Sequence, residues 1–132
     1  MGKVEKGKVY IAPGDYHMKV KMNGNNYILK LTKDKPLNNH RPSVDALFYS
    51  IAELSEVNKI AIVLTGMGSD GSEGLRKIKQ EDEDALIIAE AEETSVIYGM
   101  PRAARDTGLA DKILPLYEIG PFLKSLQANN HE

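Results

Sequence analysis

The 132 residues have an ordinary globular composition, 42% hydrophobic and 27% charged, which predicts one domain with a single core. The net charge of -2 argues against nucleic-acid binding, and the lack of cysteine excludes disulfides, thiolate zinc sites and a cysteine nucleophile within this chain. No apolar run reaches signal-peptide or membrane-spanning length, so we expect a cytoplasmic protein without membrane insertion.

The first third of the chain predicts three strands. Residues 8–14 form a β-branched and aromatic run closed by Pro-Gly, which is typical of a strand ending in a turn. Residues 17–22 and 26–31 then alternate between apolar and polar side chains on either side of Asn23-Gly24, a pattern that predicts an antiparallel hairpin. A polar connector, 32–42, follows.

The rest of the chain alternates between helical periodicity and short apolar runs. Apolar runs of this kind are typical of strands buried in a parallel sheet. The expected helices are 44–54 with Ser43 as N-cap, 72–80, 101–107, and 120–128 beginning at Pro121; the expected strands are 59–65, 85–90 and 110–116. We therefore predict an α/β fold, a doubly wound, mostly parallel sheet in three α/β/α layers, with one antiparallel hairpin.

The loop 65–74 reads TGMGSDGSEG and follows a predicted strand. Its glycines match G-x-G-x-x-G, and Glu90 lies near the spacing of a ribose-binding acid, so a dinucleotide site is one interpretation. A carboxylate inside the loop, Asp70, argues against it because it would repel a pyrophosphate. The loop also follows a strand, a hairpin and a helix, whereas a dinucleotide turn normally follows the first strand of its domain.

Asp70 itself allows two interpretations. A carboxylate at the carboxyl end of a sheet is suited to orienting a histidine during acyl transfer, with a backbone N–H such as that of Met67 receiving the developing oxyanion. Alternatively, Asp70 simply caps the helix that begins around Ser72.

Four long segments carry the most specific pattern in the sequence. They read YIAPGDYHM, HRPSVDALFYSIAE, IAIVLTGMGSDGSEGLRKIK and IYGMPRAA. In this order they resemble the CheB-type protein-glutamate methylesterases of bacterial chemotaxis, and the resemblance extends over nearly the whole chain. It implies an α/β serine hydrolase that removes methyl groups from glutamyl esters on chemoreceptors, usually under the control of an N-terminal phosphoacceptor domain.

The resemblance also implies site residues. The family's T-G-M-G-x-D-G segment carries the triad aspartate, which assigns that role to Asp70. The preceding residues Gly66, Met67 and Gly68 are implied to belong to the oxyanion and substrate wall. The family's R-P-S-V-D segment lies near the active-site mouth, and the residues that match or adjoin it are His40, Arg41, Pro42, Ser43 and Asp45.

The serine and histidine of the family are not found in this sequence. In the family they lie in a Gly-Ser/Ala-Ser-Thr-Gly-Gly turn and a Gln-His-Met segment, both upstream of the matched region. We therefore expect 1–132 to be a partial catalytic domain that lacks the first strands of the family fold and a receiver domain, and that is inactive alone. His17 precedes a methionine and imitates the missing segment, but we expect it to be a solvated residue on a strand's polar face.

The implied partners are methylated cytoplasmic helices of chemoreceptors, the missing N-terminal part of the enzyme and a receiver domain. Loss of central strands predicts self-association or strand exchange through an exposed sheet edge. No cofactor is expected, and His17, His40 and His131 are too scattered to predict a metal site. Two alternatives stay open: a non-catalytic binding or regulatory module derived from the esterase and, from the glycine pattern alone, a nucleotide-binding oxidoreductase.

Overall fold

The computed structural model describes residues 2–129 and divides into two compact units. The first unit holds the chain up to residue 59 together with 70–85, and the second holds 60–69 together with the chain from 86 onward. His131 lies outside the described residues, as does most of the C-terminal tail.

The first unit contains the predicted hairpin. Strands β1 (His17–Asn23) and β2 (Asn26–Thr32) pair antiparallel, with Asn23 opposite Asn26 at the closed end. The two central turn residues are Gly24 and Asn25, and Gly24 has a φ of +64°, which glycine adopts without steric cost. The hairpin prediction is confirmed, with the turn centred one residue later than Asn23-Gly24.

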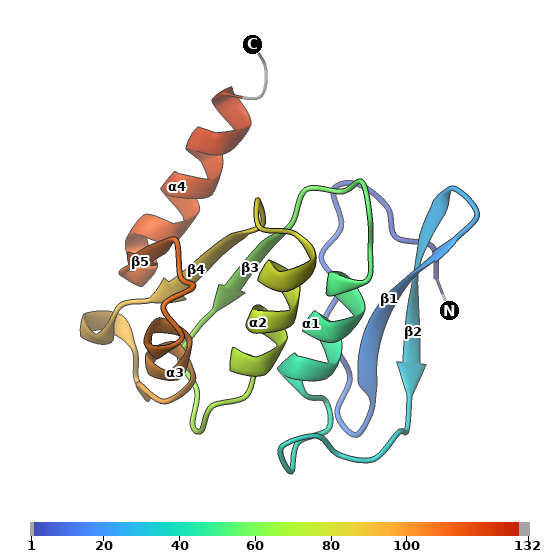
Figure 1. The fold of residues 1–132 in the computed structure, drawn as a ribbon, viewed down its shortest axis with the longest axis horizontal. Coiled ribbons are helices and arrows are strands. Elements are labelled where there is room, and N and C mark those ends of the chain that lie inside the picture. Colours follow the sequence, from blue (N-terminus) through green and yellow to red (C-terminus); the bar gives the residue numbers. More distant parts are fainter. Residues whose placement is uncertain (1, 130–132) are drawn as a thin grey trace. The chain divides into compact units, whose positions relative to one another are not determined.

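Two helices complete the first unit. Helix α1 (Val44–Ala52) packs against β1 on one side and against α2 (Ser72–Glu81) on the other (Figure 1). Ser43 is the N-cap of α1, as predicted, and its hydroxyl accepts the N–H of Ala46 at 3.4 Å. The buried apolar side chains of the two helices are Ala46, Phe48, Ala52, Leu75 and Ile78.

The predicted strand at 8–14 is wrong. These residues form no regular ladder, and the side chains of Val9 and Ile11 are 90% and 87% exposed. The edge of β2 is instead contacted by the residues before them, because Val4 donates its N–H to Tyr27 and Leu29 donates to Gly2. A β-branched run becomes a strand only where a partner strand satisfies its backbone, and no described residue pairs with this one.

The second unit is a parallel sheet with the strand order β3-β4-β5. Its strands are β3 (Ile60–Val63), β4 (Leu86–Glu90) and β5 (Lys112–Leu114), and all lie within the predicted runs. Helix α3 (Met100–Asp106) contacts β3 and β4, with Pro101 in its first turn, and a short 3-10 turn, η1 (Glu92–Thr94), follows β4. Buried positions of the sheet are Ala61, Val63, Ile87, Ile88 and Ala89.

Helix α4 (Leu116–Asn129) begins four residues before the predicted start at Gly120. The hydroxyl of Thr94 accepts the N–H of Leu116 at 2.9 Å and so satisfies one donor of its first turn. Pro121 therefore lies inside the helix rather than at its start. The residue before it is Gly120, which has no Cβ to collide with the proline ring.

Within residues 2–129, no helix is both long and apolar enough to cross a membrane. The same residues hold no group of three or more histidine or acidic side chains arranged to bind a metal ion.

Candidate functional site

Asp70 has a buried side chain, only 4% exposed, at the start of the segment that leads into α2. Its Oδ1 accepts hydrogen bonds from the Ser43 hydroxyl at 2.8 Å, from Asn38 Nδ2 at 3.0 Å and from the Asp45 N–H at 3.1 Å. Its Oδ2 accepts the N–H of Val44 at 2.7 Å. Four donors therefore fix this carboxylate, three of them on one oxygen.

The Asp70 carboxylate caps α1, because Val44 and Asp45 are the first two residues of that helix and their N–H groups have no partner within it. The interpretation of Asp70 as the cap of the helix that begins near Ser72 is wrong. The N-cap of α2 is Gly71, which has a φ of +103° and no side chain to donate or accept.

The Asp45 carboxylate caps α2 in a similar way. Its Oδ1 accepts the N–H of Gly74, in the first turn of α2, at 2.7 Å, and its Oδ2 accepts Asn38 Nδ2 at 2.7 Å. Glycine is needed at 74, because an added Cβ would lie 2.5 Å from the Cβ of Phe48 and 3.0 Å from Asp45 Oδ1. Each helix N-terminus is thus capped by a carboxylate that belongs to the other helix or to its leading segment.

The two buried carboxyl groups have oppositely shifted pKa values. Burial raises the pKa of Asp70, but the hydrogen bonds from Val44, Asn38, Asp45 and Ser43 outweigh it and leave the pKa below its ordinary value of 3.8. Burial is also the largest influence on Asp45, and with the nearby charge of Asp70 it raises the pKa of Asp45 above 3.8 despite the Gly74 and Asn38 hydrogen bonds. Of the two carboxyl groups, Asp70 is therefore the one that stays ionised to lower pH.

His17 is buried, 2% exposed, which corrects the expectation of a solvated histidine. Its Nδ1 accepts the N–H of Ser43 at 3.2 Å, so Nε2 carries the proton and donates to the Lys35 carbonyl at 2.9 Å. The Ser43 hydroxyl donates to Asp70 and makes no hydrogen bond to the imidazole. These three side chains therefore do not form a serine–histidine–aspartate relay.

The remaining residues of the R-P-S-V-D region hold the connector in place. Arg41 donates to Asp15 Oδ1 from Nη2 at 2.6 Å and from Nε at 3.1 Å, and this lowers the pKa of Asp15. His40 is exposed, and its backbone pairs with that of Leu37. Pro42 and Ser43 line a cavity of about 150 Å³ together with Ala12, Met18, Val44 and Leu47.

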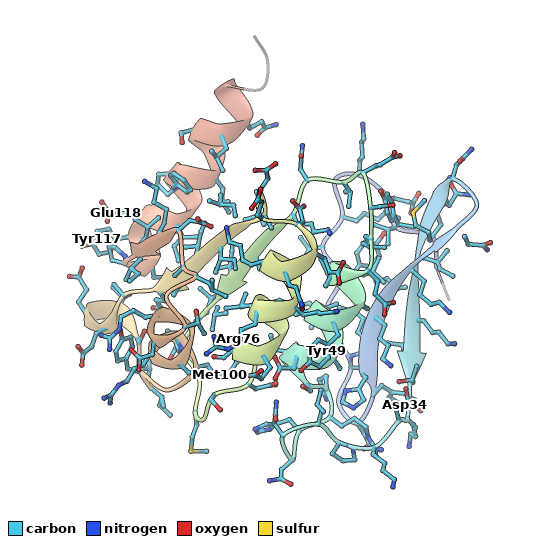
Figure 2. All side chains as sticks on the ribbon, in the orientation of Figure 1. Asp34, Tyr49, Arg76, Met100, Tyr117 and Glu118 are labelled. Atoms are coloured by element: carbon cyan, nitrogen blue, oxygen red, sulfur yellow. The ribbon has the colours of Figure 1, made fainter. Side chains whose placement is uncertain are left out.

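In the second unit, the predicted loop residues Gly66 and Gly68 pack against the segment that leads into α3. The carbonyl of Gly66 accepts the N–H groups of Gly99 at 3.1 Å and of Met100 at 2.8 Å. An added Cβ on Gly66 would lie 2.5 Å from the Sδ of Met100 at the start of α3 (Figure 2), and one on Gly99 would lie 2.7 Å from the Gly66 carbonyl oxygen. Gly68 has a φ of +88°. Glycine is required here for backbone contact as well as for conformation.

This packing fixes the direction of the Met67 N–H. That N–H shares a trans peptide with the Gly66 carbonyl, so it points away from the α3 N-terminus that binds the carbonyl. No residue in the described part of the chain accepts it, and the Met67 side chain is 74% exposed. The loop therefore presents an oriented backbone donor.

Sequence reasoning missed Asn38, and it considered Glu90 only as a ribose-binding acid. Asn38 bridges Asp45 and Asp70, and the only hint of it was a pair of adjacent asparagines, a residue type that tolerates positive φ. Glu90 is 1% exposed and accepts the Thr65 N–H at 2.8 Å, which anchors the loop at the end of β3. A charged residue that ends an otherwise apolar strand was the available signal for Glu90.

The dinucleotide interpretation of the glycine pattern loses its structural support. The N-terminus of α2, where a pyrophosphate would bind, is already occupied by the carboxylate of Asp45. Glu90, the candidate ribose ligand, is engaged with the Thr65 N–H and is inaccessible.

The site thus consists of a buried aspartate in the first unit and a glycine-built loop after a parallel strand of the second unit, in a chain of the α/β class. Residues 2–123 match the family model of the CheB methylesterase, and the chain belongs to this family. The residue patterns that carried the resemblance thus identified the family correctly.

Similar proteins agree with this assignment. The chain is 45% identical over 124 residues to the protein-glutamate methylesterase/protein-glutamine glutaminase 1 of Hahella chejuensis, covering 94% of this chain and 34% of that protein. It is 47% identical over 125 residues to the protein-glutamate methylesterase/protein-glutamine glutaminase of Bdellovibrio bacteriovorus, covering 94% and 35%. The chain spans about a third of the length of these curated relatives.

A solved structure confirms the fold class. The catalytic domain of the Thermotoga maritima CheB methylesterase superposes with a TM-score of 0.89 at 41% sequence identity. The match covers 95% of this chain and 65% of that chain. The α/β fold with a parallel sheet and one antiparallel hairpin is therefore the CheB catalytic fold.

Proposed function

We propose that this chain contributes to a protein-glutamate methylesterase that hydrolyses glutamyl methyl esters on the cytoplasmic helices of chemoreceptors by a serine–histidine–aspartate mechanism. Asp70 is the aspartate, and the serine and histidine come from polypeptide outside these 132 residues. Because these receptor helices lie in the cytoplasm, we propose that the protein acts there. One observation carries the proposal: Asp70 is buried and ionised, and its Oδ2 accepts one hydrogen bond whereas its Oδ1 accepts three.

The unequal occupancy of the two oxygens is what a triad carboxylate needs. Oδ2 accepts only the Val44 N–H and so has a lone pair open to a further donor, whereas Oδ1 is already shared by three donors. In the proposed mechanism that donor is the imidazole N–H, which the carboxylate holds in the required tautomer. The imidazole then takes the serine proton as the hydroxyl attacks the ester carbonyl. It gives that proton to the methoxide oxygen as the C–O bond breaks, so that methanol leaves. Water cleaves the acyl-enzyme and releases the free glutamate side chain.

The Met67 N–H is the proposed oxyanion donor. Its support is the backbone geometry of the second unit, where the bound Gly66 carbonyl orients this N–H without a competing acceptor among the described residues. A preorganised donor of this kind stabilises a developing oxyanion, because it needs no reorganisation as the charge appears. The relatives are also named protein-glutamine glutaminases. We extend that activity to this site, because an amide follows the same acyl-transfer route with ammonia as the leaving group.

The alternative function is a non-catalytic binding module derived from the esterase. Ser43 and His17 are the serine and histidine in the hydrogen-bond network of Asp70, and their hydrogen bonds do not form a catalytic relay. This observation favours the alternative. The exposed Val9 and Ile11 are apolar surface that a binding partner would cover.

Methyl-ester hydrolysis tests the proposal. We expect no turnover by the chain alone and turnover after addition of a relative's N-terminal catalytic segment that carries the serine and histidine. Asp70→Asn is expected to lower the restored rate by roughly 10³- to 10⁴-fold, because the amide favours the wrong tautomer of the imidazole. Asp34→Asn is the matched control, because Asp34 is an exposed carboxylate paired with Lys19 (Figure 2). We expect this substitution to leave the rate unchanged. Hydrolysis by the chain alone, or full activity of the Asp70→Asn mixture, would contradict the proposal.

A further inference from the structure

Asn38 donates both hydrogens of its side-chain amide to the two buried carboxylates. Its Nδ2 lies 2.7 Å from Asp45 Oδ2 and 3.0 Å from Asp70 Oδ1. The orientation of the amide is fixed, because its carbonyl oxygen in that position would face two acceptors. Asp45 and Asp70 are 2% and 4% exposed, whereas Asn38 itself lies at the surface.

Asn38 differs in origin from the other donors around these carboxylates. The Ser43 hydroxyl and the N–H groups of Val44, Asp45 and Gly74 belong to the N-termini of α1 and α2 and are present whenever those helices form. Asn38 comes from the connector that precedes α1. Among the described residues it is also the one donor that contacts both carboxylates, and so it lies between two groups whose charges repel each other.

We propose that Asn38 is a positioning residue for Asp70: by bridging Asp45 and Asp70 it holds the third hydrogen bond on Oδ1 and thereby leaves Oδ2 directed at the imidazole. The orientation of Oδ2 toward an imidazole rests on the proposed function, whereas the two hydrogen bonds of Asn38 do not. A bridging amide is suited to this task because a planar double donor hydrogen-bonds two neighbouring anions at once, whereas a lysine ammonium is a point charge on a flexible stem.

A purely conformational role for Asn38 makes a different prediction. Asn38 has a φ of +55°, and its neighbour Asn39 has a φ of +64°, so both occupy backbone conformations that asparagine tolerates. No described residue forms a hydrogen bond with the side chain of Asn39, so Asn39 shares the exposure and the positive φ of Asn38 but not the bridge. If Asn38 serves only the backbone, equivalent substitutions at the two positions have equivalent effects.

The test compares Asn38→Ala with Asn39→Ala in this chain by carboxyl ¹³C titration and amide hydrogen exchange. In Asn38→Ala we expect the pKa values of both Asp45 and Asp70 to rise, and the N–H of Val44 to exchange about tenfold faster through loss of one charge-assisted hydrogen bond. Asn39→Ala should leave the two pKa values and the exchange rate of the Val44 N–H unchanged. The neighbouring titratable groups that must be assigned in the same spectra are Tyr49 of α1 (Figure 2), Glu73 of α2 and His17 of β1.

Asn38→Asp separates the donor from the backbone preference. Aspartate also tolerates positive φ but offers a third carboxylate in place of the amide, so the upward pKa shifts should exceed those of Asn38→Ala, with Asn39→Asp as control. If substitutions at positions 38 and 39 shifted the pKa values of Asp45 and Asp70 equally, the bridging role of Asn38 would be overturned. In the reconstituted esterase, Asn38→Ala should lower kcat with little change in KM. Normal kcat with shifted carboxyl pKa values would overturn the positioning role, while full activity of Asp70→Asn would overturn the proposed function instead.

Discussion

The Asp70 site and the 66–68 loop achieve rigidity in opposite ways. Around Asp70, the fixed element is a charged side chain, and its donors include a side-chain amide, a hydroxyl and two helix N–H groups. In the 66–68 loop, the fixed element is a peptide group held by the N–H groups of Gly99 and Met100, and the requirement is the absence of side-chain volume. The first site should therefore respond to changes of charge and proton concentration, and the second to changes of volume.

Gly99→Ala should have the largest effect on stability. Its added Cβ would meet backbone atoms, the Gly66 carbonyl oxygen at 2.7 Å and the Gly68 nitrogen at 2.8 Å, which cannot move away as a side chain does. We expect a loss of about 3 kcal/mol in the free energy of unfolding, measured by urea denaturation. Gly14→Ala is the control, because an added Cβ there contacts nothing within 4 Å. Equal stabilities of the two variants would contradict the close approach.

Asp70→Asn tests the other site with almost no change in volume. The amide supplies one acceptor where the carboxylate supplied two, and its NH₂ group meets a helix N–H or the Ser43 hydroxyl. We expect a loss of about 2 kcal/mol, because a buried helix N-terminus is left incompletely capped. A loss as small as that of an exposed Asp34→Asn substitution would show that Asp70 does not cap α1.

The pH dependence of stability sharpens the contrast. The pKa of Asp70 is depressed in the folded chain, so its stabilising contribution is present above the unfolded value of 3.8 and is lost as pH falls through the folded pKa. The stability difference between the wild type and Asp70→Asn should therefore be constant near neutrality and shrink below pH 3.8. Asp45 acts in the opposite sense, because its raised pKa makes its ionisation destabilising, a cost that is relieved as pH falls through that pKa.

The same titration applied to Gly99→Ala provides the comparison. A steric collision does not depend on proton concentration, so its stability deficit should stay constant over the acidic range in which that of Asp70→Asn changes. If the loss of unfolding free energy in Gly99→Ala changed with pH, a steric collision alone would not explain it, and the contrast between the two sites would fail.

Ser43→Ala should have the smallest effect. It removes one donor from Asp70 Oδ1 and the side-chain cap of α1 but leaves the carboxylate and its backbone donors in place. We expect a loss of about 1 kcal/mol by urea denaturation and a rise in the pKa of Asp70. A loss equal to that of Asp70→Asn would indicate that the hydroxyl, rather than the carboxylate, organises the site.

The sequence was sufficient wherever the physical cause is local. Side-chain alternation predicted the hairpin, and helical periodicity with Ser43 as cap predicted α1. It failed where the cause lies far along the chain. The start of α4 depends on the hydroxyl of Thr94, 22 positions from Leu116, and the apolar run 8–14 lacks the partner that would make it a strand.

The candidate site shows the same division. The motif resemblance drew attention to Asp70, whose catalytic role stays a prediction. Nothing in the local sequence indicates that Asn38 reaches Asp70 from 32 positions away, or that the Asp70 carboxylate caps α1 rather than α2. Likewise, the oriented N–H of Met67 depends on the Gly66 carbonyl meeting a segment more than 30 residues downstream. Residue type suggested the chemistry, whereas only the tertiary structure defines which donor meets which acceptor.

The exchange of caps between α1 and α2 has a consequence for how the chain folds. Val44 and Asp70 are 26 positions apart, and although Ser43 caps α1 locally, neither helix obtains its carboxylate cap until those distant stretches have met. Closure of the loop between these segments and stabilisation of the two helix N-termini are then coupled. This coupling disfavours states in which one of the two helices is formed and the other is not. A nascent chain would gain little from its first helix until synthesis had passed Gly74, so α1 and α2 are expected to form late and together.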